Sequence, residues 1–206
     1  MLVNILEFTV QIKTNSRKAT NWCFDIDNVP EWGYWSEALT AEECDKLIEI
    51  GEQKNLVAAE VSGKSVDEIR DSKISWLYPE DCSWLFERLT YIVTDLNTKY
   101  FKFDLYGFTE GFQFTKYEAP SGYYGKHIDK VTNDVIRKLS LSIQLSDSST
   151  YEGGELELHT SNDPTVCTKE RGHLILFPSY TLHEVKPVTK GTRYSLVSWV
   201  TGAPFR

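Results

Sequence analysis

The chain has 206 residues, of which 41% are hydrophobic and 13% aromatic, and this composition predicts a folded globular protein rather than a disordered one. Its formal net charge of −8 argues against a nucleic-acid partner, because proteins that grip nucleic acids usually carry a basic face. No apolar run approaches the ~18 residues that a membrane span needs. The start, MLVNILEFTVQI, lacks the basic leader and apolar core of a secretion signal.

The cysteines indicate a reducing compartment. Their positions are far apart in the sequence and form no C-x-x-C pair: Cys23, Cys44, Cys82 and Cys167. Such spacing predicts reduced, structural thiols in a cytoplasmic protein and disfavours a zinc site built on them.

Helical signals lie in the first half of the chain. Thr40-Ala41-Glu42-Glu43 fits a capping box, with Thr40 as N-cap, Leu47 and Ile48 on one side, and Gly51 as the expected stop. A second helix is predicted after Pro79, because four apolar residues form one stripe at i, i+4, i+7 and i+11: Leu85, Leu89, Ile92 and Leu96. Both helices are expected to pack on a sheet and to take no part in chemistry.

The second half changes to the period of strands. In RKLSLSIQLSD, apolar residues alternate with small polar ones, and GGELELHT, GHLILFPS and TRYSLVSWV predict further strands. Breaks are expected at 147–154, 162–164 and 187–191, where glycine, proline or asparagine occur. Several short strands after two helices predict a β-sandwich or barrel buttressed by helices, an α+β or mainly β fold.

The stretch YYGKHIDK places His127 and Asp129 two residues apart, so on a strand both point to the same side. A lone His-x-Asp is weak evidence, since polar residues commonly fill exposed strand faces. His183 follows a later strand, and two histidines with one carboxylate are the facial triad of non-haem Fe(II) oxygenases. Arg193, ten residues further on, suits bidentate capture of a carboxylate.

From about Ala38 to Trp199 the sequence resembles the Fe(II)/2-oxoglutarate-dependent dioxygenases, in their prolyl 4-hydroxylase-like branch. Three segments carry the resemblance: FQFTKYEAPSGYYGKHIDK, LSLSIQLSDSSTYEGGELELH and GHLILFPSYTLHEVKPVTKGTRYSLVSW. The resemblance implies a double-stranded β-helix, or jelly roll. We therefore expect a single domain over 1–206, with mostly helical support in 1–100 and the catalytic jelly-roll core in 101–206.

The resemblance also implies roles for individual residues. His127, Asp129 and His183 match the iron ligands, and Arg193 matches the residue that pairs with the distal carboxylate of 2-oxoglutarate. Four further positions match cosubstrate or pocket residues of relatives, although each also has an ordinary interpretation as a core or strand residue: Tyr117, Gln144, Ser195 and Trp199. Gln144 departs from the pattern, because some relatives have a second tyrosine there. His159, His173 and Glu184 are expected to be ordinary, Glu184 because it points away from its neighbour His183 on an extended chain.

The resemblance implies hydroxylation of an unactivated C–H bond. Fe(II) is the expected cofactor, 2-oxoglutarate and O2 are the expected cosubstrates, and succinate and CO2 are the coproducts. Ascorbate is expected to support the activity. The branch suggests a peptidyl proline substrate, and a free amino acid or another small molecule remains an alternative. Neither a membrane nor a nucleic-acid partner is expected, and the sequence does not fix the oligomeric state.

Three other functions stay open at this point. An AlkB-like nucleic-acid demethylase is disfavoured, because its second arginine position holds Trp199 here. A catalytically silent jelly-roll binding module and a zinc or cupin-like protein would each keep the fold. Two segments add hypotheses about the entrance: 57–73 as a mobile lid, and 70–76 as either a lining of the substrate mouth or, as we favour, a surface strand.

Overall fold

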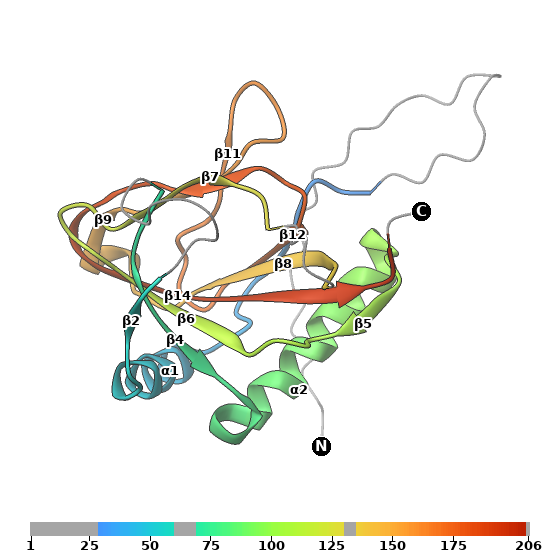
Figure 1. Ribbon diagram of the computed structural model, residues 1–206, viewed down its shortest axis with the longest axis horizontal. Coiled ribbons are helices and arrows are strands. Elements are labelled where there is room, and N and C mark those ends of the chain that lie inside the picture. Colours follow the sequence, from blue (N-terminus) through green and yellow to red (C-terminus); the bar gives the residue numbers. More distant parts are fainter. Residues whose placement is uncertain (1–28, 60–68, 130–134, 205–206) are drawn as a thin grey trace, which may run out of the picture.

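Two facing antiparallel sheets form the body of the protein. The computed structural model describes residues 29–59, 69–129 and 135–204. The nine-stranded sheet has the order β1-β12-β8-β14-β6-β4-β2, with β5 and β9 also paired to β14, and the five-stranded sheet has the order β11-β10-β13-β7-β3. Figure 1 shows the two helices together on one side of the larger sheet, with β7 and β11 on the other side. The jelly roll buttressed by helices is confirmed.

The larger sheet is built from strands of both halves of the chain. Its members are β1 (Gly33–Trp35), β2 (Val57–Ala58), β4 (Lys73–Leu77), β5 (Leu105–Gly107), β6 (Phe112–Glu118), β8 (Arg137–Gln144), β9 (Tyr151–Gly153), β12 (Leu174–Pro178) and β14 (Val188–Gly202). The smaller sheet comprises β3 (Arg70–Asp71), β7 (Tyr123–His127), β10 (Leu156–Leu158), β11 (Thr165–Val166) and β13 (His183–Val185). The first hundred residues thus supply strands to both sheets as well as the helical support that was expected.

Helix α1 (Ala41–Gln53) begins with the predicted capping box. The amide of Glu43 donates to Thr40 Oγ1 at 3.2 Å, and the amide of Thr40 donates to the Glu43 carboxylate at 3.0 Å. Helix α2 (Pro79–Leu96) continues into a π-helical turn, η2 (Asn97–Phe101), and a short 3-10 turn, η3 (Ser148–Thr150), precedes β9. All four residues of the predicted apolar stripe of α2 are buried, as expected.

The alternation along β8 divides the interior into two cores. Leu139, Leu141 and Ile143 belong to the cluster that includes the buried faces of α1 and α2. A second, smaller cluster contains Ile175 and Phe177 of β12. Of the small polar residues of β8, Ser140 is buried and Ser142 is half-buried, and their short side chains leave room between the sheets. This room is where the site described below is found.

Three predicted boundaries are wrong. The segment 147–154 is not only a break, since it contains the strand β9, which pairs with β14. Helix α1 does not stop at Gly51 but runs on to Gln53, and Gly51 instead packs closely against the ring of Phe114, where a Cβ atom would not fit. The segment 187–191 is not a break, since β14 starts at Val188 and pairs with β9 through Gly191. The register of this pairing shifts between Val188 and Lys190, and Gly191, with a φ of +73°, still pairs with Tyr151, so the strand continues.

The entrance hypotheses have different outcomes. Most of the proposed lid, residues 60–68, lies outside the described residues. The segment 70–76 is not a surface strand, because Arg70, Ser72, Ile74 and Ser75 are buried. Within the part of the chain that the structure describes, no helix is long and apolar enough to cross a bilayer.

Candidate active site

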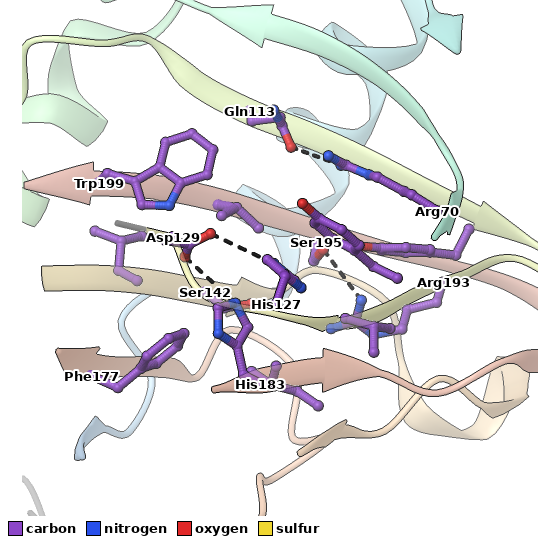
Figure 2. Close-up of a pocket in the computed structure, with 16 residues that line it drawn as sticks. Arg70, Gln113, His127, Asp129, Ser142, Phe177, His183, Arg193, Ser195 and Trp199 are labelled. Carbon is purple, nitrogen blue, oxygen red and sulfur yellow. Dashed lines mark hydrogen bonds and ion pairs between the residues drawn. The ribbon is translucent and has the colours of Figure 1, made fainter. Parts of the chain in front are cut away.

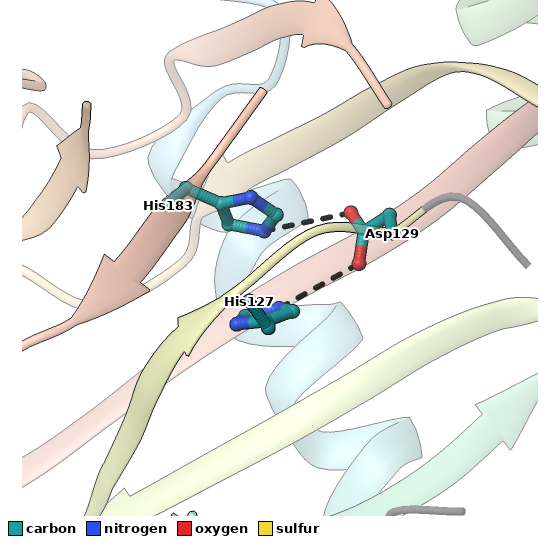
Figure 3. A group of neighbouring side chains, drawn as sticks. All are labelled: His127, Asp129 and His183. Atoms are coloured by element: carbon teal, nitrogen blue, oxygen red, sulfur yellow. Dashed lines mark ion pairs between the residues drawn. The ribbon is translucent and has the colours of Figure 1, made fainter. Parts of the chain in front are cut away.

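Three side chains from β7 and β13 converge between the sheets. His127 ends β7, His183 begins β13, and the two residues are direct partners in the antiparallel pairing of these strands. Their rings lie 4.1 Å apart, and Asp129, just beyond β7, reaches toward both (Figure 3). Each residue offers one ligand atom within 4.8 Å of the others. The predicted triad is therefore brought together in space.

The hydrogen bonds of the two histidines fix which ring nitrogen is free. His127 Nδ1 donates to the carbonyl of Gly125 at 2.8 Å, and His183 Nδ1 donates to the carbonyl of Thr181 at 2.9 Å. Because a carbonyl can only accept, each Nδ1 carries the proton and each Nε2 keeps its lone pair. Those two Nε2 atoms lie 3.6 and 3.5 Å from the Asp129 carboxylate oxygens.

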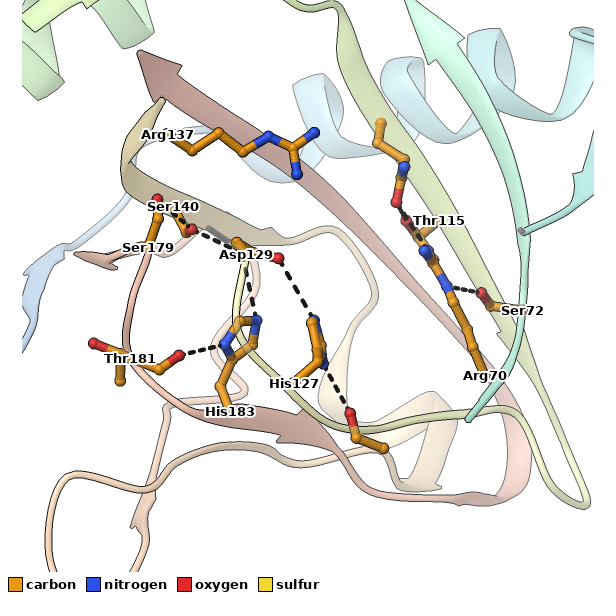
Figure 4. Close-up of polar contacts among 12 residues, drawn as sticks. Arg70, Ser72, Thr115, His127, Asp129, Arg137, Ser140, Ser179, Thr181 and His183 are labelled. Carbon is orange, nitrogen blue, oxygen red and sulfur yellow. Dashed lines mark hydrogen bonds and ion pairs between the residues drawn. The ribbon is translucent and has the colours of Figure 1, made fainter. Parts of the chain in front are cut away.

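The carboxylate and the backbone of Asp129 are positioned by hydrogen bonds to residues outside the triad. Ser140 Oγ donates to Asp129 Oδ2 at 2.7 Å and lies 3.0 Å from Ser179 Oγ, while the amide of Asp129 donates to the carbonyl of Ser179 (Figure 4). Burial by itself would raise the pKa of the Asp129 carboxyl, but the charges of His183 and His127 and the bond from Ser140 hold that pKa below its ordinary value. Burial lowers the pKa of His183. The triad thus presents an anionic oxygen at neutral pH, and burial favours the neutral imidazole of His183.

This donor set fits a divalent iron ion. Neighbouring ligands of an octahedral ion are roughly 3 Å apart when metal–ligand bonds are about 2.1 Å long, close to the separations found here. Three ligands on one face leave three positions for other molecules, and nitrogen with oxygen donors suit Fe(II) without the thiolates that favour zinc. The carbonyl partners of both Nδ1 atoms are the kind of support that orients metal-binding histidines.

The triad opens into a pocket between the sheets that encloses about 440 Å³ of space, including its mouth. Figure 2 shows Trp199 and Phe177 to one side of the triad, with Arg70 and Arg193 to the other. Asp129 is the only carboxylate that lines this pocket among the described residues.

Arg193 is buried on β14 opposite Tyr117 of β6. Its Nη1 donates to Ser195 Oγ at 3.3 Å, and its Cζ lies 5.3 Å from the centre of the Tyr117 ring. Its Nε is buried without a hydrogen-bond partner, and no carboxylate among the described residues is within ion-pair distance. A buried guanidinium in this condition favours an anion as its partner, so the group formed by Arg193, Ser195 and Tyr117 is suited to a carboxylate.

The other two predicted cosubstrate residues differ from each other. Trp199 lines the pocket, packs against Trp76, and has the guanidinium of Arg137 3.6 Å from its ring centre. Gln144 does not line this pocket; its amide donates to Tyr151 Oη at 2.9 Å in a smaller cavity behind Arg193. Gln144 therefore supports the back of the site rather than its opening.

Sequence reasoning missed three pocket residues. Tyr124 stacks on the imidazole of His127 with ring centres 3.5 Å apart, and Arg70 of β3 pairs with it across the strands. Gln113 of β6 accepts a hydrogen bond from Arg70. The aromatic Tyr124, three residues before His127, was visible in the motif. Arg70 lies in the segment 70–76, for which a lining of the substrate mouth was the less favoured interpretation, and nothing local in the sequence signals Gln113.

The histidines that were expected to be ordinary lie outside this pocket. His173 Nδ1 is 2.9 Å from Tyr34 Oη. His159 is 3.0 Å from Glu184, which points away from the triad as predicted, and Glu157 is nearby. Lys186 lies within 4.0 Å of both glutamates and supplies their counter-charge.

Comparisons with known proteins agree with this geometry. Residues 112–201 match the sequence profile of the 2OG-Fe(II) oxygenase superfamily. A PKHD-type hydroxylase of Prochlorococcus marinus is 37% identical over 110 residues, which is 53% of this chain and 48% of the relative. The chain thus spans about half the length of the curated relatives it matches.

Solved structures show the same fold. A prolyl-4-hydroxylase of Pseudomonas putida matches with a TM-score of 0.69 and 22% identity, covering 84% of this chain and 94% of that one. A prolyl hydroxylase from Trichoplax adhaerens, solved with a peptide fragment of hypoxia inducible factor, matches with a TM-score of 0.71 and 20% identity over 84% of each chain. In the matched segment, the fold and the triad, the chain is similar to the 2OG-Fe(II) oxygenase superfamily and resembles its prolyl 4-hydroxylase-like branch.

Proposed function

We propose that the protein is an Fe(II)- and 2-oxoglutarate-dependent dioxygenase that hydroxylates an unactivated C–H bond, and that its substrate is a prolyl residue of a peptide. The observation that supports this most is the pair of Nε2 atoms, left free by the two carbonyls and facing the ionised Asp129. The names of the relatives, PKHD-type hydroxylase and prolyl-4-hydroxylase, support the choice of proline.

In this proposal His127, Asp129 and His183 hold the iron, and Arg193 with Ser195 holds the far carboxylate of 2-oxoglutarate. Bound together, iron and 2-oxoglutarate supply the oxidising chemistry: 2-oxoglutarate loses CO2 to become succinate, which takes one oxygen atom of O2 while the other enters the C–H bond. The protein orients the reactants, and the rings of Trp199 and Phe177 limit the access of water.

The same arrangement of His127, His183 and Asp129 would also suit a binding module that no longer catalyses a reaction. The test must therefore distinguish an active enzyme from such a binding module. Protein loaded with Fe(II) under anaerobic conditions is mixed with 2-oxoglutarate, ascorbate and proline-containing peptides, and then exposed to O2. We expect succinate and a peptide mass gain of one oxygen atom, with both absent in His127→Ala. Binding of iron and 2-oxoglutarate without succinate would leave the binding module as the function.

A further inference from the structure

The pocket holds a second buried arginine, Arg70, that none of the roles above uses. Its side chain is 6% exposed, and it comes from the short strand β3 at the edge of the smaller sheet. It lines the same pocket as the triad (Figure 2).

Among the described residues, the hydrogen-bond partners of Arg70 are all neutral. Its Nε donates to Ser72 Oγ at 2.7 Å, and its Nη2 donates to Gln113 Oε1 at 2.8 Å. No carboxylate of the described residues lies within ion-pair distance of this guanidinium, in contrast to Arg137, whose Nε and Nη2 bind the Glu110 carboxylate at 2.8 and 2.6 Å. A buried charge without a counter-charge is costly, so a partner from outside would stabilise it.

Donors remain available on this side of the pocket. Within the described chain, Arg70 Nη1 and Gln113 Nε2 have no hydrogen-bond partner, and neither is among the atoms sealed from solvent. A planar guanidinium next to an amide N–H matches the two oxygens of a carboxylate.

The charges of the assembled site point the same way. When iron and 2-oxoglutarate are bound, the two positive charges of Fe(II) and that of Arg193 balance the two carboxylates of 2-oxoglutarate and that of Asp129. The charge of Arg70 is then the one left over in the pocket. A substrate with one carboxylate would neutralise it.

The position of Arg70 relative to the triad is suitable for a substrate contact. Its Cζ lies 4.4 Å from the centre of the Tyr124 ring, and the same ring stacks on the imidazole of His127 with ring centres 3.5 Å apart. The guanidinium and a proposed iron ligand thus contact one aromatic ring, so a carboxylate held by Arg70 would place nearby C–H bonds of the same molecule beside the iron position.

We propose that Arg70, assisted by Gln113, binds a carboxylate of the substrate, so that the enzyme selects an acidic substrate. This inference rests on the proposed function for the identity of the site. Two kinds of carboxylate would fit. One is a terminal carboxylate, as in a free amino acid or the C-terminal residue of a peptide. The other is the side chain of a Glu or Asp next to the hydroxylated residue.

The test compares carboxylates with matched amides by binding alone. The protein is loaded with Zn(II) and 2-oxoglutarate without O2, and ligands are titrated by calorimetry or ligand-observed NMR. Three pairs are used: propionate with propionamide, N-acetyl-proline with N-acetyl-prolinamide, and acetyl-Glu-Pro-amide with acetyl-Gln-Pro-amide. The second pair reports a terminal carboxylate and the third a side-chain carboxylate.

We expect at least one carboxylate to bind tenfold or more tightly than its amide, and Arg70→Gln to abolish this preference while keeping its affinity for 2-oxoglutarate and metal. Arg70→Lys, which keeps the charge, should retain part of the preference if Arg70→Gln proves unstable. Arg137→Gln is the matched control and should keep the preference in full.

Equal binding within all three pairs, absence of binding by all of the carboxylates, or a preference that survives Arg70→Gln would overturn the inference. A parallel loss of carboxylate, amide and metal affinity would also overturn it, since Arg70 would then only hold Tyr124 against His127. The proposed function is tested independently of this inference: it would be wrong if the Fe(II)-loaded wild-type protein formed no succinate.

Discussion

His127 and His183 face each other as direct partners across β7 and β13. This pairing determines the site, because residues two apart on a strand share a face, and Asp129 therefore follows His127 onto the side that His183 occupies. A shift of the register by one residue would turn one imidazole to the opposite face of the sheet. The smaller sheet is thus both a structural element and the frame of the proposed metal centre.

The first prediction concerns the triad itself. Asp129→Ala removes the only carboxylate that lines the pocket among the described residues, so we expect metal affinity to fall by more than about 100-fold, beyond the loss typical of residues that only orient a ligand. Metal content after anaerobic Fe(II) loading measures this, and succinate release should fall to background. His159→Ala is the control, because His159 lies with Glu184 outside the pocket. Full succinate release by Asp129→Ala would contradict the ligand assignment.

The second prediction concerns Ser140. Its hydroxyl donates to Asp129 Oδ2 and is itself fully buried, so Ser140→Ala leaves that oxygen with one partner fewer. Loss of such support typically costs about 10–100-fold in metal affinity. Titration with Mn(II) as a stable substitute for iron would measure the change. Ser198→Ala is a useful comparison, since that buried hydroxyl has no hydrogen-bond partner among the described residues. An equal effect of both variants would mean that the effect of Ser140 is a general one on packing.

The third prediction separates cosubstrate from metal. Arg193→Ala should raise the Michaelis constant for 2-oxoglutarate at least about tenfold, because one hydrogen bond to a charged group contributes ~1.5–3 kcal/mol. The affinity for Mn(II) should stay the same, since Arg193 contacts Ser195 and Tyr117 and not the triad. Steady-state kinetics with varied 2-oxoglutarate and a parallel metal titration give both numbers. An unchanged Michaelis constant would remove Arg193 from the cosubstrate site.

The residues of the site that the sequence predicted are those that belong to short motifs occurring in a fixed order along the chain. His-x-Asp relies on the two-residue period of a strand, and the order of the later motifs places His183 and Arg193 after it. Local signals also sufficed for the capping box at Thr40 and for the apolar stripe of α2. Each of these depends on neighbours a few residues away.

The parts that were missed depend on contacts distant in the sequence. Arg70 lies on β3, which pairs with β7 opposite Tyr124, and this distant pairing is why the sequence alone favoured a surface strand at 70–76 over a lining of the pocket. Gln144 shares a strand with Ser142, yet it lies beside Tyr151 behind Arg193 rather than in the main pocket. Side-chain alternation gives the face of a strand but not the position along it at which a pocket ends.

The fourth prediction uses the glycine that was expected to end α1. Helix propensity alone would make Gly51→Ala stabilising by about 1 kcal/mol. A Cβ atom at this position, however, would lie 2.4 to 2.6 Å from atoms of the Phe114 ring, which is itself fully buried. Overpacking of this kind costs typically ~1–3 kcal/mol, so the net effect should be destabilising.

Urea unfolding of Gly51→Ala would measure this free energy. Combined with Phe114→Ala, which removes Cγ and the ring atoms that the new Cβ would meet, the same substitution should cost less, and the difference is the coupling between the two positions. A stabilised single variant, or costs that simply add, would show that Phe114 moves aside without penalty.

The fifth prediction concerns the three described cysteines, which are free and buried: Cys44, Cys82 and Cys167. Burial raises the pKa of the Cys44 and Cys82 thiols from 9.0 to about 11, and that of Cys167 to about 12. Since the thiolate is the reactive form, these residues should resist iodoacetamide in the native protein at pH ~8 and react after unfolding. Peptide mapping by mass spectrometry would assign each site.

The same shifts predict how stability depends on pH. The folded state holds its thiol protons more tightly than the unfolded chain, so this contribution is complete below pH ~9 and is lost as the pH rises toward 11 or 12. The free energy of unfolding should therefore fall between pH ~8.5 and ~10.5, before the tyrosines dominate. Cys167→Ala removes one titrating group and should flatten this slope relative to wild type, whatever its own cost in packing. An identical slope in both proteins, or rapid native alkylation of Cys167, would mean that this thiol titrates as it does in water.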